Sequence, residues 1–113
     1  MKVLVCGGRD YKDRKRVFGV LDALYPAMSG LISGGAPGAD TIAWDWGWSR
    51  GVQCERFMAD WKKHGRAAGP IRNQKMLEEG KPDIVVAFPG GSGTADMIRR
   101  AKDAGVKVVE VEP

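Results

Sequence analysis

Residues 83–101, DIVVAFPGGSGTADMIRRA, decide the fold class of this chain. The stretch opens with an apolar run rich in β-branched residues, which is typical of a buried strand, and continues into the glycine-rich turn PGGSG. After the turn, side chains recur at the i, i+3, i+4, i+7 spacing of an amphipathic helix: Thr94, Met97, Ile98 and Ala101. The stretch therefore predicts a strand, a tight turn and a helix, the unit from which parallel sheets are built.

The same alternation runs along the rest of the chain. Further strands are predicted at residues 2–6, 31–33, 52–54 and 106–111. Further helices are predicted at residues 17–24, 39–46 and 70–79. This order predicts an α/β protein with one domain over residues 1–113, a doubly wound, Rossmann-like parallel five-stranded sheet with helices on both faces. The preferred strand order is 3-2-1-4-5, with the switch point between strands 1 and 4.

Particular residues are expected to set the ends of the helices. Four glycines that stand just before apolar runs are expected to end helices in the left-handed conformation, which glycine adopts without a Cβ clash: Gly30, Gly51, Gly80 and Gly105. Asp13 and Asp40 are the expected N-caps of the first two helices. Pro70 is expected to be the first residue of the helix at 70–79.

Composition and charge are those of an ordinary globular protein. The 113 residues carry a net charge of +4, with 43% hydrophobic and 28% charged residues. No apolar run approaches the ~20 residues of a membrane span, and no charged-then-apolar leader follows Met1, so a cytoplasmic protein is expected. Cys6 and Cys54 stand apart from each other and from any histidine cluster. No metal site is therefore expected, and both are interpreted as small buried hydrophobes.

Glycine is in excess, with 16 residues, about twice the usual ~7%. Glycine-rich loops follow three predicted strands, at GGRD (7–10), GGAPGAD (34–40) and PGGSGT (89–94). All three would lie at the carboxyl ends of the strands, where doubly wound sheets bind ligands, and each runs into a helix. Backbone N–H groups at helix N-termini bind phosphate, so the loops predict an anion or phosphate site. The GxGxxG and P-loop signatures are absent, so a classical NAD fingerprint and a P-loop NTPase are not expected.

A basic segment without acids covers residues 62–75 and includes Lys62, Lys63, Arg66, Arg72 and Lys75. One interpretation is a solvated basic face. Arg72 and Asn73 are expected in the first turn of a helix, where arginine can grip a phosphate with two parallel hydrogen bonds. His64, the only histidine, has no Cys or acid nearby, and no catalytic role is expected for it.

Three tryptophans share one predicted helix. Trp46 belongs to its apolar stripe and is expected in the core. Trp44 and Trp48 are spaced i, i+4 on the opposite face. An exposed tryptophan pair on a small protein predicts a homodimer or higher symmetric oligomer packed through it. A neighbouring loop that covers the pair is the alternative.

Five ordered segments resemble the SLOG superfamily, and most closely its small YspA/YpsA-related branch: GGRDY (7–11), SGGAPGAD (33–40), ADW (59–61), AGPIRN (68–73) and FPGGSGT (88–94). The resemblance covers nearly the whole chain. It implies a Rossmann-like domain that binds a nucleotide or nucleotide-derived ligand at these loops. The ligand types expected from it are AMP, ADP-ribose, an NAD-like molecule or a nucleotide sugar.

Two better-known relatives suggest sharper functions. PGGSGT is similar to the PGGxGTxxE motif of the LOG-type phosphoribohydrolases, once labelled lysine decarboxylases, in which an arginine and the motif's glutamate cleave an N-glycosidic bond of a nucleoside monophosphate. Met97 stands at the glutamate position here, and Asp96 lies one residue early, so a hydrolase would use Arg72 and Asp96. Residues 33–40 and 72–73 are similar to the DprA family, which loads recombinase onto single-stranded DNA.

Three hypotheses follow, in order of preference: a binding module for a nucleotide-type ligand, an N-glycosidic hydrolase, and a single-stranded DNA-binding protein that uses residues 62–75. For the binding module, the expected ligand and phosphate contacts are Gly7, Gly8, Arg9, Asp10, Ser33, Gly34, Gly35, Ala36, Asp40, Arg72, Asn73, Pro89, Gly90, Gly91, Ser92, Gly93 and Thr94. Asp10, Asp40 or Asp60 would accept hydrogen bonds from ribose hydroxyls or, alternatively, cap helices.

Overall fold

The computed structural model describes residues 1–113 and contains one sheet of five parallel strands. The strands are β1 (Lys2–Cys6), β2 (Gly30–Ser33), β3 (Cys54–Arg56), β4 (Ile84–Ala87) and β5 (Lys107–Glu110). Their order in the sheet is β3-β2-β1-β4-β5, and every neighbouring pair is parallel. The predicted fold class, strand order and switch point between β1 and β4 are therefore confirmed.

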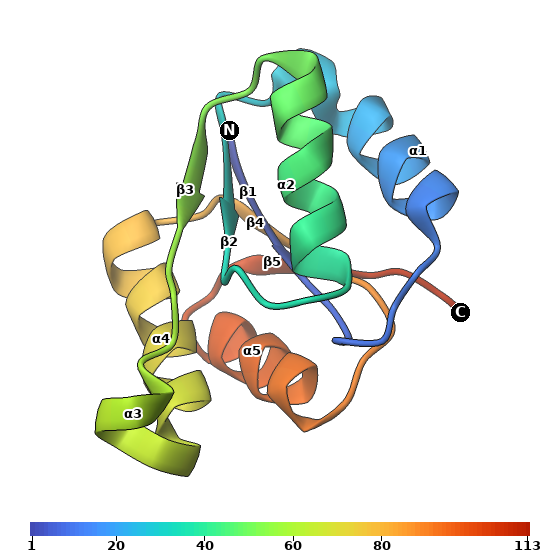
Figure 1. The fold of residues 1–113 in the computed structure, drawn as a ribbon. Coiled ribbons are helices and arrows are strands. Elements are labelled where there is room, and N and C mark those ends of the chain that lie inside the picture. Colours follow the sequence, from blue (N-terminus) through green and yellow to red (C-terminus); the bar gives the residue numbers. More distant parts are fainter.

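Helices cover both faces of the sheet (Figure 1). The helices are α1 (Arg14–Leu24), α2 (Ala39–Arg50), α3 (Trp61–His64), α4 (Ala68–Lys75) and α5 (Ser92–Asp103). Short 3₁₀ turns occupy Tyr25–Ala27 and Gly65–Ala67, and a π-helical turn, Met76–Gly80, extends α4. The helix α3 was not predicted. No helix in this structure has the length and apolarity needed to cross a bilayer.

Alternation along the strands divides the core into two layers. Val3 and Val5 of β1 pack with the buried side chains of α1 and α2, including Trp46, which has no exposed surface. Leu4 and Cys6 face the opposite side and pack with residues of α5 and the π-helical turn. The predicted core position of Trp46 is thus confirmed, and the continuous apolar strands are explained by burial on both faces.

Of the three residues predicted to lie at helix starts, one has the predicted role. Asp13 caps α1, because its carboxylate accepts a hydrogen bond of 3.0 Å from the N–H of Arg16. Asp40 is not an N-cap; α2 starts after Gly38, and Asp40 is its second residue. Pro70 is the third residue of α4 rather than the first, because the chain enters this helix continuously from the preceding 3₁₀ turn.

The glycine stops are correct at two of four positions. Gly51 and Gly105 have φ angles of 67° and 76°, as the left-handed helix stop requires. Gly30 is already in β2. Gly80 does not take the left-handed position, which falls instead on Lys81 with φ 50°. A Cβ at Gly80 would lie 3.0 Å from the side chain of Ile32, so close packing explains this glycine.

The strand β3 begins two residues later than predicted. The N–H of Val52 donates to the carbonyl of Gly47 at 2.9 Å, which completes the hydrogen bonding at the end of α2. Residues 51 and 52 are thereby used to terminate the helix, and the ladder with β2 starts only at Cys54, which pairs with Leu31.

The two outer tryptophans of α2 differ in exposure. Trp48 is 76% exposed. Trp44 is half-buried, with the guanidinium of Arg56 stacked 3.9 Å from its ring centroid, so the structure covers one member of the pair. The homodimer through Trp44 and Trp48 stays a prediction. Light scattering on the wild type and on a double variant, Trp44→Ala with Trp48→Ala, would check it.

Candidate functional site

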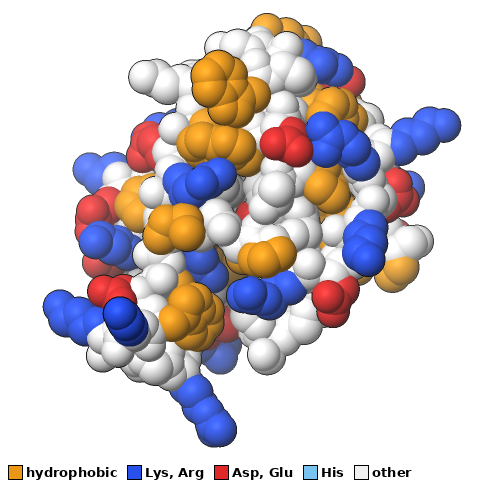
Figure 2. Space-filling model, viewed as in Figure 1, with side chains coloured by type: hydrophobic (Ala, Val, Ile, Leu, Met, Phe, Trp, Pro, Cys, Tyr) orange, Lys and Arg blue, Asp and Glu red, His pale blue; other side chains and the backbone are white.

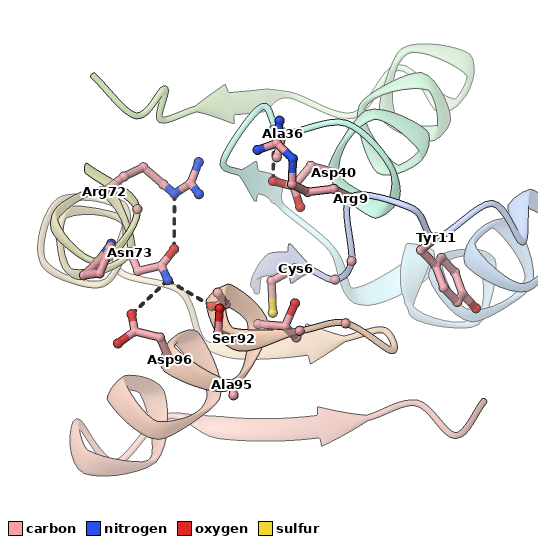
Figure 3. A pocket seen from close by; sticks show the side chains of 18 of the residues that line it. Cys6, Arg9, Tyr11, Ala36, Asp40, Arg72, Asn73, Ser92, Ala95 and Asp96 are labelled. Carbon is pink, nitrogen blue, oxygen red and sulfur yellow. Dashed lines mark hydrogen bonds between the residues drawn. The ribbon is translucent and has the colours of Figure 1, made fainter. Parts of the chain in front are cut away.

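A cleft of about 1340 Å³ opens at the carboxyl edge of the sheet. The β1–α1 loop, the β2–α2 loop, the α3–α4 region and the β4–α5 loop all contribute to its lining. In the view of Figure 3, Cys6 lies between Asp40 and Ser92, while Arg72 and Asn73 approach from α4. The cleft therefore lies at the switch point, where the topology predicts a ligand site.

The β4–α5 loop presents a run of free backbone donors to this cleft. The first N–H bonded within α5 is that of Ala95, which donates to the carbonyl of Gly91 at 3.0 Å. The N–H groups of residues 90–94 have no acceptor in the chain, and the N-cap Gly91 offers no side chain. We call these N–H groups the amide cradle. A helix N-terminus with unpaired N–H groups attracts anions.

In the β2–α2 loop, backbone N–H groups are already hydrogen-bonded to other groups of the chain. Asp40 folds back so that its Oδ2 accepts a hydrogen bond of 3.2 Å from the N–H of Ala36. The N–H of Ala39 donates to the carbonyl of Gly8 at 3.2 Å. Burial raises the pKa of Asp40 to about 6, although the Ala36 N–H and the charge of Arg72 oppose this rise. This loop therefore supplies a carboxylate to the cleft where the sequence predicted a phosphate cradle.

Arg72 lies in the middle of α4, not in its first turn as predicted. Its Nη1 donates to the carbonyl of Gly34 at 2.7 Å, and its Nε donates to Oδ1 of Asn73 at 3.1 Å. Burial lowers the pKa of the guanidinium, with the charge of Asp40 opposing that effect. Arg72 thus links α4 to the β2–α2 loop by a hydrogen bond, and its side chain also lines the cleft.

Asn73 and Asp96 form a network behind the amide cradle. The Nδ2 of Asn73 donates to the carbonyl of Gly93 at 3.2 Å and to Asp96 at 3.0 Å. Asp96 also pairs with Arg99 at 2.7 Å and with Arg100 at 2.8 Å. Partial burial raises the pKa of Asp96, but hydrogen bonds from Asn73 and Arg100 and the charges of both arginines outweigh it and hold the pKa below its usual value.

Comparison with known proteins identifies the family of this chain. A sequence model of YAcAr, the YspA, cpYpsA-related SLOG family, matches residues 1–64, more than half of the chain. The chain belongs to this family. It is also 41% identical over 118 residues to the "Gene 61 protein" of Mycobacterium phage D29, covering 96% of this chain and 94% of that protein. The resemblance to the SLOG superfamily found in the sequence is thus confirmed.

The YAcAr chain has a similar fold to a DNA-processing protein. The X-ray structure of DNA processing protein A (DprA) from Streptococcus pneumoniae matches with a TM-score of 0.83, covering 99% of this chain and 50% of that one. The sequence identity is 20%, so this likeness shows the shared Rossmann-like fold alone. The chain spans about half the length of the DprA chain.

Most of the predicted contact residues of this YAcAr chain line the cleft: Gly7, Gly8, Arg9, Asp10, Ala36, Asp40, Arg72, Asn73, Pro89, Gly90, Gly91, Ser92, Gly93 and Thr94, together with Asp96. Three do not. Ser33 is buried, Gly34 lies beneath the guanidinium of Arg72, and Gly35 faces Met58 and Arg56 with φ 72°. These three residues do not line the cleft.

Sequence reasoning missed several lining residues: Cys6, Tyr11, Trp61, Arg66, Met76 and Arg99. Tyr11 and Trp61 stand within the segments that resemble the SLOG superfamily, which was the available signal. Cys6 is buried at the cleft floor, and burial raises the pKa of its thiol to about 12, so the thiol stays protonated near neutral pH. No group of three His, Cys, Asp or Glu side chains is arranged to hold a metal ion.

Proposed function

We propose that this YAcAr protein binds a nucleotide or nucleotide-derived ligand, with a phosphate group in the amide cradle of residues 90–94. The observation that carries the proposal is the run of backbone N–H groups without acceptors at the start of α5, exposed at the switch point. Such donors, aimed by the helix, suit a phosphate group. Arg9 and Arg99 also line the cleft and add positive charge.

The rest of the cleft suits the nucleoside part of such a ligand. Its volume of about 1340 Å³ leaves room beyond a phosphate group. Trp61 lines it and is 52% exposed, which leaves ring surface for a base to stack on. Asp10 and Asp40 also line it and offer carboxylates to ribose hydroxyls. AMP, ADP-ribose, NAD and nucleotide sugars share these chemical parts and are the ligands to test.

Thermal unfolding with each of these ligands tests the proposal, with adenosine as the matched control that lacks a phosphate. A ligand at 100 times its dissociation constant stabilises by about 2.7 kcal/mol, which raises the Tm of a domain of this size by several degrees. At least one phosphorylated compound is expected to raise the Tm where adenosine at equal concentration does not. No shift with any compound, or an equal shift with adenosine, contradicts the proposal.

The hydrolase hypothesis needs Asp96 and Arg72 at the reacting atoms. Both line the cleft, but Asp96 is held ionised by two arginines, and the guanidinium of Arg72 is hydrogen-bonded to Gly34 and Asn73. Chromatographic detection of base released from nucleoside 5′-monophosphates tests this hypothesis. Release by the wild type and its loss in Asp96→Asn would support it. No release, or release that survives the substitution, would remove Asp96 as the catalytic residue.

Single-stranded DNA binding is the second alternative, favoured by an exposed aromatic ring beside cations. Trp61 and Arg66 both line the cleft, and Lys62 and Lys63 are exposed next to them. On the face of the molecule that Figure 2 shows, Lys and Arg side chains are interspersed with acidic ones and are not gathered into one basic patch. Binding that weakens steeply with rising salt is required, so affinity for a single strand that is absent at low salt, or indifferent to salt, contradicts this function.

A further inference from the structure

The two ends of the cleft differ in charge. At one end stand the unpaired N–H groups of the amide cradle. At the other end stands Asp40, which lines the cleft although only 6% of it is exposed. In Figure 3, Asp40 and Ser92 lie on opposite sides of Cys6, which belongs to the floor. A ligand that fills the cleft therefore meets hydrogen-bond donors at one end and a carboxylate at the other.

The charge of Asp40 is not cancelled by a close ion pair. The charged groups that influence it are Arg72 from α4 and Arg56 from β3, with the neutral thiol of Cys6 from β1 nearby. None of the ion pairs of 4.0 Å or less in the protein includes Asp40. The Nη1 of Arg72 is engaged instead by the carbonyl of Gly34. A second anion placed against Asp40 would meet repulsion from this carboxylate in a poorly solvated site, which the charges of Arg72 and Arg56 reduce without pairing with it.

Hydrogen bonding at Asp40 also favours an uncharged group over a second phosphate. The Ala36 N–H already donates to Asp40, and a carboxylate accepts further hydrogen bonds from hydroxyl groups but donates none. An uncharged group with hydroxyl donors satisfies this end of the cleft, whereas a phosphate, which is an acceptor, does not.

We propose that Asp40 is a specificity-determining residue that accepts an uncharged, hydroxyl-bearing part of the ligand, such as a free ribose diol, and excludes a second phosphate from that position. The proposal rests on the proposed function, in which the first phosphate occupies the amide cradle. Asp40 would then distinguish ligands with a free diol from otherwise identical ligands phosphorylated on that diol.

Calorimetric titration with three probes tests the proposal: AMP, adenosine 3′,5′-bisphosphate and 2′,3′-dideoxy-AMP. The wild type is expected to bind AMP at least tenfold more tightly than either of the others at pH 7.5. In Asp40→Asn the preference over the bisphosphate is expected to fall by tenfold or more. Asp103→Asn, which removes an exposed carboxylate outside the cleft, is the matched control and is expected to leave the preferences unchanged.

A second neutral variant guards against misfolding. Asp40→Ser keeps a short oxygen acceptor for the Ala36 N–H and is expected to relax the preference in the same way. If AMP binds the wild type but the preference is absent, or survives in both neutral variants, the role of Asp40 is refuted while the proposed function stands. If none of the three probes binds the wild type, the role of Asp40 is refuted, and the thermal unfolding series with ADP-ribose, NAD and nucleotide sugars decides the proposed function separately.

Discussion

The β2–α2 loop and the β4–α5 loop have similar sequences, but they differ in whether their backbone N–H groups are engaged. Both are glycine-rich, both follow a central strand, and both enter a helix through a glycine N-cap, Gly38 or Gly91. The second residue of the helix is Asp40 in one case and Gly93 in the other. Asp40 turns back onto the Ala36 N–H and closes its loop, whereas Gly93 has no side chain and leaves the amide cradle open.

Glycine content alone therefore does not identify an anion site. Gly38 is required because a Cβ there would collide with backbone oxygens of the β1–α1 loop, and its φ is 83°. A Cβ at Gly91 would meet nothing within 4 Å. In the first loop glycine serves close packing, and in the second its absence of a side chain keeps the backbone donors accessible.

The largest effect expected from this comparison is on stability. Gly38→Ala is expected to lower the free energy of unfolding by roughly 3 kcal/mol or more, because strain at positive φ adds to the collision with the carbonyl of Gly8. Gly91→Ala is the matched control and is expected to stay within about 0.5 kcal/mol of the wild type. Urea unfolding of both variants measures the two free energies of unfolding, and similar losses in the two would contradict the different roles assigned to these glycines.

Copying the acid of the first loop into the second tests whether the open donors bind the ligand. Gly93→Asp introduces a carboxylate at the helix position that Asp40 occupies in α2, with open space around it. We expect affinity for a phosphorylated ligand to fall by roughly ten- to a hundredfold, or about 1.4–2.7 kcal/mol, while helix stability is unchanged or improves. Gly93→Asn separates charge from size and is expected to lose less affinity. Unchanged affinity in Gly93→Asp would move the phosphate elsewhere.

The stability of the protein is expected to depend on pH through Asp40. In the folded protein the pKa of Asp40 is about 6, above the ordinary aspartate value of 3.8, so folding favours the protonated form. The stabilising contribution of that proton is fully present below pH 3.8 and is lost as the pH rises through 6. From pH 7 to pH 5 we expect the wild type to gain about 1 kcal/mol relative to Asp40→Asn. Denaturant unfolding across this range measures it, and parallel curves would contradict the assigned burial.

The smallest effect concerns the carboxylate of the open loop's helix. The pKa of Asp96 lies below its usual value, so its contribution is present above pH 4 and is lost as the pH falls through the folded pKa. Asp96→Asn is therefore expected to destabilise the protein by about 0.5–1 kcal/mol at pH 7, because the pairs with Arg99 and Arg100 are partly solvated. Asp40→Asn is expected to have the opposite sign at that pH.

The sequence was sufficient for the fold because its signals are local. Apolar runs, glycine turns and helical periods occur in the order that dictates a parallel sheet, and the loops necessarily meet at one edge. Whether the N–H groups of each loop are engaged or free was not predictable, because this depends on contacts between distant segments. Asp40 had the residue type of an N-cap, yet its carboxylate is directed by Ala36, and Arg72 is oriented by Gly34, 38 positions earlier.

The open amides also determine how this cleft behaves in hydrogen exchange. A backbone N–H without an acceptor exchanges its proton with water at close to the rate of an unfolded peptide, even while the domain stays folded. Residues 90–94 thus exchange rapidly in the free protein, whereas the Ala36 N–H, bonded to Asp40, is protected by the fold itself. An anion held by residues 90–94 slows their exchange and leaves that of Ala36 unchanged, which makes these backbone protons direct reporters of occupancy.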